Sequence, residues 1–393
     1  MTTLLTSSPA TLSVTSFPYS LPASGQAALI GANIAADVRP ATHNVYEWNY
    51  ALFFFYGGGT FVEDYSAGGA YVNASSGGHA VPPNFGGCLF DFADATWKRI
   101  DNANGMPWIK RDLNAPGFSG EINSFGEINW PGVSAGIPAP SHLYGNVLPL
   151  SAANGGGNRG SALILRSMAA GYDSNRGSTH AHRFDLSSGL WTRHSTNPSI
   201  GNSGFRTACY DPTTNRYYMI RYELHEAASL DYLDGADWAW KQVGIRTPAA
   251  DGDNKSAFID DARRLLIVQT STNRLRAIDL NNMGAGFVTL RTAGNLPPDN
   301  QSQWHRYPAD GCWYTYVGNG GNTLHKIQPP AGNLLTETWQ VSTVQVGGGN
   351  LASQPREAIE NGSVHNTRFF YVRALGCFAW IAGEGNRVAI LKP

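Results

Sequence analysis

Charged residues are scarce in this chain. Asp, Glu, Lys and Arg make up 15% of its 393 residues, and the formal net charge is -1. Average soluble domains contain about 25% of these residues. So few cations leave no basic face for nucleic acid, and the sequence has no acidic tail. No apolar run reaches the length of about 18 residues that a membrane helix needs, so we expect no membrane insertion.

The N-terminus also lacks a basic segment followed by an apolar core, which a secretion signal requires. Cysteine is rare, and no two cysteines have the CxxC spacing of a metal or redox site. Each cysteine is next to aromatic or aliphatic residues in a predicted strand, which predicts four buried thiols. The four are Cys88, Cys209, Cys312 and Cys377.

Residues 204–244 contain four short β-rich segments in succession. Turn residues separate them: Pro212 fixes φ, Asn215 tolerates left-handed geometry, and Gly235 lies in the second turn. Four strands joined by tight turns within about 40 residues have the size of one propeller blade. The predicted strands are 205–210, 216–222, 227–233 and 238–243.

Comparable units recur along the chain and predict one all-β domain over residues 1–393, a β-propeller of six four-stranded antiparallel blades. In the first unit we place two strands within 43–55 and a turn at Gly57 to Gly59. Further units begin near Ser141, Phe205, Lys255, Gln303 and Arg356.

Two segments fall outside this repeat. The last unit has only three strands before the chain stops, so we expect the alternating segment 10–17 to supply its fourth strand and close the ring. The segment 102–140 is rich in Gly, Pro and Asn, and we interpret it as a long insertion loop. If it contains a divergent blade instead, the propeller has seven blades.

Aspartate precedes tryptophan by six residues in three of the units, at Asp91 and Trp97, Asp185 and Trp191, and Asp234 and Trp240. Together with glycine doublets such as Gly77-Gly78 and Gly320-Gly321, this pattern resembles the kelch repeat and the propeller domain of the galactose-oxidase type. The resemblance covers nearly the whole chain and implies the propeller fold. The C-terminal sequence FAWIAGEGNRVAILKP is similar to the ends of uncharacterised kelch-like proteins of proteobacteria and their tailed phages.

The copper chemistry of the galactose-oxidase family needs a radical tyrosine bonded to cysteine, a Tyr-His pair and a further histidine. No tyrosine precedes a histidine here, and adjacent strand residues such as Cys209 and Tyr210 point to opposite faces. Phosphate loops, nucleophile elbows and zinc signatures are also missing from the sequence. The sequence therefore favours a non-enzymatic protein, with no catalytic residues, metal or cofactor.

Two groups of residues have a functional and a structural interpretation. His180 and His182 share one face of a predicted strand and could share a metal. Because no third ligand is evident, we interpret them as polar residues of an outer strand. The aspartates Asp251, Asp253, Asp260 and Asp261 lie in predicted turns, where their backbone hydrogen bonds are sufficient explanation.

The starts of the innermost strands are more informative, because they line one end of a propeller channel. A ring of cationic and imidazole groups there could bind a carboxylate or a sugar acid. A hydrated polar channel is the alternative. The candidate ligand-binding residues are His142, Arg206, Lys255, Trp304, His305 and Arg356, with His43 at the same place in the first unit.

These observations favour a structural or binding propeller. Its most concrete form is a virion protein of a tailed phage, in the tail or a fibre, that attaches to other proteins of the assembly or to the host surface. A homo-oligomer fits this role. One alternative is a carbohydrate-binding or carbohydrate-active protein that uses the channel mouth, with a host-surface glycan as partner. The other is a kelch-like adaptor of the cytoplasm.

Overall fold

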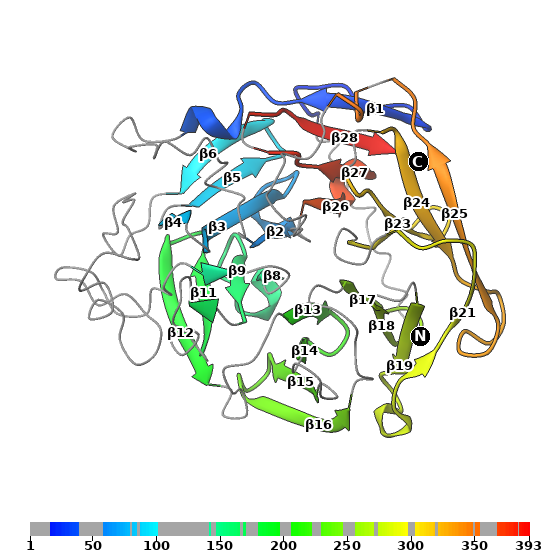
Figure 1. Ribbon diagram of the computed structural model, residues 1–393. Helices are drawn as coiled ribbons and strands as arrows, with labels where there is room; N and C mark the ends of the chain where they lie inside the picture. The colour runs from blue at the N-terminus through cyan, green and yellow to red at the C-terminus, as the bar shows by residue number, and fades with distance from the viewer. Residues whose placement is uncertain are drawn as a thin grey trace, which may run out of the picture.

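Six small antiparallel sheets stand in a ring around a central axis in the computed structural model (Figure 1). Each sheet is one blade, and the first strand of each blade lies innermost. The structure describes residues 16–38, 58–78, 81–84, 87–100, 141–142, 147–165, 168–169, 180–196, 206–221, 229–246, 256–270, 274–297, 303–318, 321–348, 350–353, 368–383 and 385–393.

Blades 1 to 3 follow one another along the chain. Blade 1 consists of β2 (Gly58–Val62), β3 (Ala70–Gly78), β5 (Gly87–Asp91) and β6 (Thr96–Ile100), with β4 (Val81–Asn84) paired to β3. Blade 2 consists of β8 (Val147–Leu150), β9 (Ser161–Ile164), β11 (His180–Asp185) and β12 (Leu190–Thr196). Blade 3 consists of β13 (Arg206–Asp211), β14 (Arg216–Arg221), β15 (Ser229–Asp234) and β16 (Trp240–Arg246).

Blades 4 to 6 complete the ring. Blade 4 consists of β17 (Ser256–Asp260), β18 (Leu265–Thr270), β19 (Arg274–Asp279) and β20 (Val288–Thr289). Blade 5 consists of β22 (His305–Arg306), β23 (Trp313–Thr315), β24 (Thr323–Gln328) and β25 (Thr338–Gln345), with β21 (Arg291–Ala293) added outside β25. Blade 6 consists of β26 (Phe369–Val372), β27 (Cys377–Trp380), β28 (Val388–Lys392) and β1 (Gln26–Ile30).

The number of blades is six. The innermost strand of blade 1, β2, directly contacts β8 of blade 2, and β8 in turn contacts β13. This contact leaves no place in the ring for a seventh blade between the first two. The segment 102–140, between β6 and β7 (Ser141–His142), lies outside the described residues.

An N-terminal strand does complete the last blade, as the sequence predicts, but a different segment supplies it. β1 pairs antiparallel with β28 along its whole length, from Gln26 opposite Lys392 to Ile30 opposite Val388. The segment 10–17 lies mostly outside the described residues, and Ser16 and Phe17 are not in a strand. The sequence of β1, QAALI, is rich in alanine and has little intrinsic strand preference, so pairing with β28 decides its structure.

The predicted start of blade 1 is also wrong in one respect. Gly58 and Gly59 open the innermost strand β2 and do not form a turn. Gly59 lies under the Tyr71 side chain, which would collide with any Cβ at that position. Glycine here marks a close approach of a neighbouring side chain, which a sequence pattern does not distinguish from a turn. The predicted strands within 43–55 lie outside the described residues.

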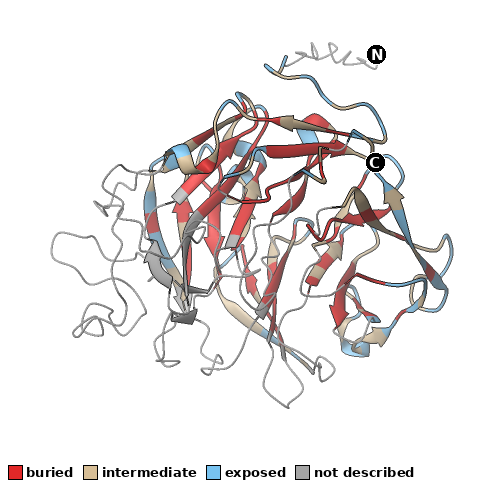
Figure 2. Ribbon diagram, turned by 45° about the horizontal axis from the view of Figure 1, so that its top comes forward, coloured by how far each residue is buried: buried red, intermediate tan, exposed pale blue. Residues whose placement is uncertain are grey.

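Apolar side chains fill the spaces between neighbouring blades, where the buried residues of Figure 2 gather. Between blades 6 and 1, Phe370 stacks on Phe61 at 5.2 Å and on Tyr71 at 5.4 Å between ring centroids. Aromatic pairs of this kind contribute about 0.5–1.5 kcal/mol beyond their buried area. The four cysteines are free and buried in these layers, as predicted, and burial raises the pKa of the Cys377 thiol to about 11.

One turn pattern recurs where strands end. An aspartate ends the strand, its carboxylate accepts from backbone N–H groups of the turn, and the residue four positions later has a positive φ. In two of these turns the backbone N–H of Gly189 and of Trp238 donates to the carbonyl of the strand-ending aspartate, each at 2.8 Å. The aspartates are Asp91, Asp185, Asp211, Asp234 and Asp260, and the residues with positive φ are Ala95, Gly189, Asn215, Trp238 and Arg264.

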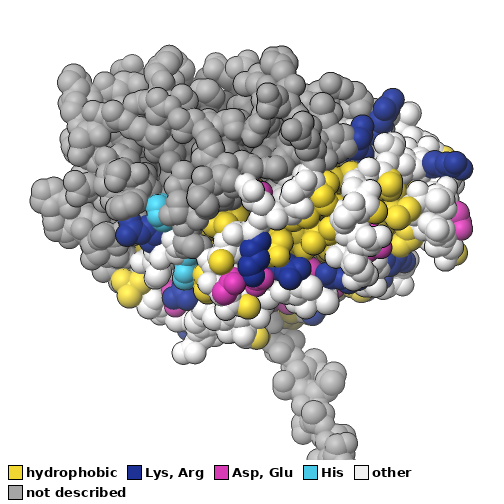
Figure 3. Space-filling model, turned by 90° about the horizontal axis from the view of Figure 1, so that it is seen from below, with side chains coloured by type: hydrophobic (Ala, Val, Ile, Leu, Met, Phe, Trp, Pro, Cys, Tyr) yellow, Lys and Arg dark blue, Asp and Glu magenta, His cyan; other side chains and the backbone are white. Residues whose placement is uncertain are grey.

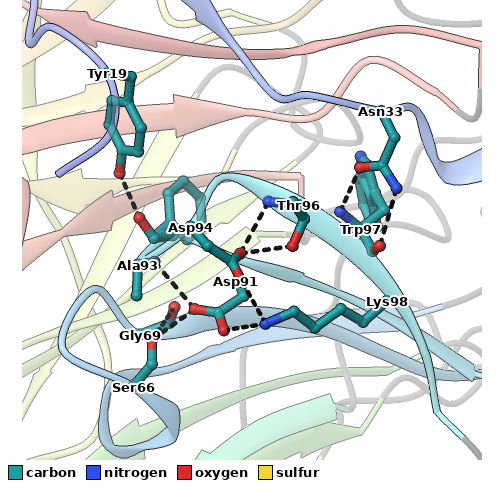
Figure 4. Close-up of polar contacts among 11 residues, drawn as sticks. Tyr19, Asn33, Ser66, Gly69, Asp91, Ala93, Asp94, Thr96, Trp97 and Lys98 are labelled. Atoms are coloured by element: carbon teal, nitrogen blue, oxygen red, sulfur yellow. Dashed lines mark hydrogen bonds and ion pairs between the residues drawn. The ribbon is translucent and has the colours of Figure 1, made fainter.

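These turns account for the aspartates that the sequence spacing singles out. In Figure 4, Asp91 accepts from the Ser66 hydroxyl at 2.7 Å and from the Ala93 backbone N–H at 3.0 Å, and it pairs with Lys98 at 2.6 Å. Asp260 likewise accepts from the backbone N–H of Arg263. Each carboxylate is occupied by its own turn.

Two of these turns and the connection between β8 and β9 reach across to a neighbouring blade through side chains, and we name these three contacts side-chain latches. Arg264 of blade 4 donates two bonds of 2.7 Å to Asp211 of blade 3. Trp238 of blade 3 stacks on His194 of blade 2, with 3.9 Å between ring centroids. Asn154 of blade 2 donates to the hydroxyl of Tyr210 in blade 3 at 2.5 Å. The latches join blades 2, 3 and 4.

Residues 16–38, which we name the strap, join the other blades. Beyond its pairing with β28, the strap meets blade 5 where the Gly347 backbone N–H donates to the Gly25 carbonyl at 2.7 Å. It meets blade 1 at two points visible in Figure 4. The Tyr19 hydroxyl donates to the Phe92 carbonyl at 2.5 Å, and Asn33 exchanges two bonds of 2.8 and 3.0 Å with the backbone of Trp97.

Candidate functional site

The innermost strands begin at one end of the channel, which we name the mouth. Small polar side chains are buried along these strands: Thr60 in β2, Thr207 in β13 and Ser256 in β17. Arg368, directly before β26, is also buried and donates to the Ala382 carbonyl at 2.7 Å. The mouth therefore has polar side chains from at least four blades.

Among the predicted site residues, three lie outside the described residues: His43, Lys255 and Arg356. Arg206 begins β13, opposite Arg221, at the predicted start of an innermost strand. His142 is not on an innermost strand. It belongs to β7, which pairs with β10 (Met168–Ala169) in a separate two-stranded sheet, whereas the innermost strand of blade 2 starts at Val147. Strand pattern alone did not separate this small sheet from blade 2, whose strands β8 and β9 lie between β7 and β10 in the chain.

Trp304 is a core residue. It is 2% exposed and packs against Phe258 of blade 4, with 6.3 Å between ring centroids. Its indole N–H donates to Gln269 Oε1 at 2.7 Å, and Gln269 donates in turn to the Pro297 carbonyl at 2.6 Å. The Trp304 indole therefore has its packing contacts and its hydrogen-bond partner between blades 4 and 5, and it does not face a ligand at the mouth.

His305 does occupy the predicted position. It is the first residue of β22, its ring lies 6.4 Å from that of Phe369 in blade 6, and it makes a hydrogen bond with the Phe369 backbone. Burial lowers the pKa of His305 to about 4, so its imidazole is neutral at pH 7. Its Nε2 atom is buried without a hydrogen-bond partner.

Gln303 is a mouth residue that the sequence analysis did not single out. Its backbone N–H donates to Thr315 Oγ1 at 2.9 Å, which fixes the approach to β22. Its side-chain Oε1 is buried without a hydrogen-bond partner, like His305 Nε2. Its position two residues before His305 is the signal that could have found it, since it lies directly before the same innermost strand.

The histidine pair of blade 2 lies far along the sheet from the channel, on the third strand β11. The rings of His180 and His182 are 6.5 Å apart, and His182 is fully buried. In the described part of the chain, no three His, Cys, Asp or Glu residues are grouped so that they could hold a metal ion. We therefore keep the interpretation of His180 and His182 as polar residues of a strand.

The outer rim shows a second surface feature. Figure 3 views the side on which β16 lies in Figure 1 and shows apolar side chains between Lys, Arg, Asp and Glu groups. The partly buried Val243 and Ile245 of β16 pack on the same core as Met283 and Phe287 of blade 4. Among the described residues, no helix has the length and apolar content needed to cross a membrane.

The sheets and their order define the chain as a six-bladed β-propeller. Comparison with known protein families and with curated proteins finds no match. Among solved structures the chain is similar to one described as the extracellular domain of a one-component system from B. thetaiotaomicron, at 11% identity and a TM-score of 0.40. The similarity covers 92% of this chain and 40% of that chain. The kelch and phage resemblances stay predictions from the sequence.

Proposed function

We propose that the chain is a non-enzymatic structural or binding propeller that works as one component of a larger protein assembly. Its most concrete form is a virion protein of a tailed phage, in the tail or associated with its fibres, that attaches to other proteins or to the host surface. The C-terminal resemblance to kelch-like phage proteins supports this form. The kelch-like repeat supports a scaffold whose loops do the binding.

The observation that carries the proposal is how the blades are joined. Side-chain latches join blades 2, 3 and 4, and the strap joins blades 5, 6 and 1. A ring held together in this way keeps its loops at fixed positions, which lowers the entropy lost when a partner binds. The strand-ending aspartates Asp185, Asp234 and Asp260 accept from backbone N–H groups of their own turns, which is a structural use of these carboxylates.

Mass spectrometry of purified particles from the source lysate tests the virion role directly. We expect peptides of this chain in the particle fraction at a constant ratio to a known tail protein across a density gradient. Complete absence from particles, with the chain recovered only from the cytoplasm of cells without phage genes, would contradict the virion role and favour the adaptor.

The segment 102–140 is the attachment element that we expect, because it enters the chain between two blades whose inner strands already touch. Replacing it with a flexible linker of about ten residues should leave the thermal midpoint within a few degrees of wild type and abolish incorporation into particles. A scrambled segment of the same length and composition is the matched control for bulk. Unfolding of the linker variant would show that the segment is part of the fold.

A further inference from the structure

Gln303 and His305 lie two residues apart where the chain enters blade 5, and each has one buried side-chain atom that no contact among the described residues satisfies. Trp304 between them packs into the core of blades 4 and 5. His305 opens β22, which contacts β26 of blade 6, so its ring lies at the boundary between blades 5 and 6.

Both side chains present a buried acceptor without a donor. His305 uses one side of its ring in the bond with the Phe369 backbone, and its Nε2 has no partner. Gln303 Oε1 has no partner either. More than about 90% of buried polar groups in folded proteins are paired, and an unpaired one costs about 1–3 kcal/mol. Two such atoms within three residues of the chain indicate a missing donor.

The chemistry of the pair restricts what that donor is. The imidazole is neutral at pH 7, because burial lowers the pKa of His305 to about 4, and no neighbouring carboxylate contributes to the shift. A cation bound here would lack a compensating negative charge. The described residues also contain no group of three metal-ligating side chains at this place. A neutral hydroxyl group, which donates one hydrogen bond, fits both acceptors.

We propose that Gln303 and His305 bind hydroxyl groups of a sugar or another polyol at the channel mouth, between blades 5 and 6. A ligand with several hydroxyl groups can donate to both acceptors at once. The Phe369 ring and its backbone hold the imidazole in place. The proposal is independent of the virion role, since an adaptor or a lectin could have the same site.

Saturation-transfer NMR of the full chain at pH 7 tests the site with a panel of monosaccharides, methyl glycosides and oligosaccharides from bacterial surface polysaccharides. We expect at least one of them to bind. His305→Ala and Gln303→Ala should each weaken its binding about tenfold, the equivalent of one hydrogen bond. Binding should also weaken as the pH approaches 4, because protonated Nε2 no longer accepts.

His194→Gln is the matched control, because His194 is another partly buried histidine whose pKa burial lowers to about 4, in blade 2. It should bind the sugar as wild type does, and circular dichroism should show all variants folded. Binding by no member of the panel, or equal binding by wild type and both mouth variants, would overturn the proposal. A soaked crystal with an ordered water on both acceptors and no sugar would do the same.

Discussion

The outer edges of the ring are protected in two different ways in its two halves. In blades 5, 6 and 1 another part of the chain covers the outermost strand. β21 pairs with β25, Gly347 bonds to the residues around β1, and Asn33 bonds to β6. The outermost strands of blades 2 and 3 have no such cover among the described residues. We name the two halves the covered half and the bare half.

The bare half shows what an uncovered edge requires. Both β12 and β16 contain extra residues opposite their partner strands, so each has a bulge, and Gly244 in β16 has a φ of +71°. The outermost strand of blade 4, β20, has only two residues. The pairings of β6, β25 and β1 are regular. Bulges and short strands are known means of preventing edge-to-edge aggregation. Among the fourth strands of the described blades, the bulges of β12 and β16 and the short β20 lie outside the covered half.

The halves also differ in how their blades are joined. Strand pairing of β1 and of β21, together with the Tyr19 and Asn33 side chains of the strap, holds the covered half, whereas the side-chain latches hold the bare half. Two of the latch residues, Arg264 and Trp238, have a left-handed backbone conformation although neither is glycine. The positive φ costs about 1 kcal/mol at each residue, and the side chain of each contacts the neighbouring blade.

Removing β1, the strand of the strap that completes blade 6, should have the largest effect, because it uncovers the edge of β28. A chain that begins at Gly31 loses β1 and exposes the regular edge of β28, including buried Ile390 and Leu391. We expect loss of cooperative unfolding and aggregation in size-exclusion chromatography. Deletion of residues 1–15 alone is the control and should preserve the monomer peak. A soluble, cooperatively unfolding protein without β1 would refute the role given to the strap.

Arg264→Ala tests the strongest latch of the bare half. Asp211 is buried, and although burial opposes its ionisation, the bonds from Arg264 keep the pKa of that carboxyl below its usual value. Removing the partner leaves a buried charge and should cost about 3 kcal/mol in chemical denaturation. Arg264→Gly should lose about 1 kcal/mol less, because glycine removes the strain at φ +57°.

Arg373→Ala is the matched control for this latch. Arg373 pairs with Glu63 between blades 6 and 1 at 3.4 Å, but both side chains are exposed. Its loss should change stability by less than about 1 kcal/mol. An equal cost for the two arginines would show that the side-chain latches are no more than surface pairs.

Acid should weaken both halves through one histidine each. Burial is the main cause that lowers the pKa of His194, in the bare half, and of His305, in the covered half, to about 4. Below the unfolded pKa of about 6.5 the unfolded chain binds protons that the folded chain does not, so stability falls from pH 6.5 toward 4. Between pH 7 and 5 we expect a loss on the order of 2 kcal/mol for the buried His305 and a smaller loss for the partly exposed His194.

Denaturation curves at the two pH values separate the contributions. His194→Gln and His305→Gln should each remove their part of the pH dependence, and the double variant should remove both. An unchanged slope in either variant would assign the acid sensitivity to other groups.

Asn33→Ala should have the smallest effect, because it removes one contact of many in the strap. The side chain bonds to both backbone groups of Trp97, at 2.8 and 3.0 Å. About 1–2 kcal/mol should be lost in chemical denaturation. Hydrogen exchange should accelerate at the Trp97 amide and not at Trp191, whose strand the strap does not touch. Equal acceleration at both would mean that the strap does not protect β6 locally.

The sequence predicted most of the fold because the turns are strongly marked. In blade 3, Asp211, Asn215 and Asp234 end or begin strands within two residues of the predicted limits. β1 and β2 were missed because QAALI and GGTFV have no strand signature of their own. The conformation of β1 depends on its pairing with β28, which is distant in the sequence. That of β2 depends on the close approach of the Tyr71 side chain, which only the three-dimensional structure shows.

The site was less predictable than the fold. His305 was found by its position at the start of a strand, whereas Trp304 and His142 shared that position in sequence but not in space. The missing donors of Gln303 and His305 depend on what blade 6 places opposite them. A sequence pattern therefore cannot predict that these two acceptors have no hydrogen-bond donor among the described residues.

Closure by the strap has a consequence for biosynthesis. Residues 26–30 leave the ribosome long before their partners in β28, since Gln26 lies opposite Lys392. At about 5–20 residues per second, β1 waits on the order of 20 seconds or longer for β28. During that time blades 1 to 5 can form, while an unpaired apolar strand stays open to other chains. The last step of folding is therefore a contact of very long sequence separation, and chaperones that act on nascent chains should matter most at this step.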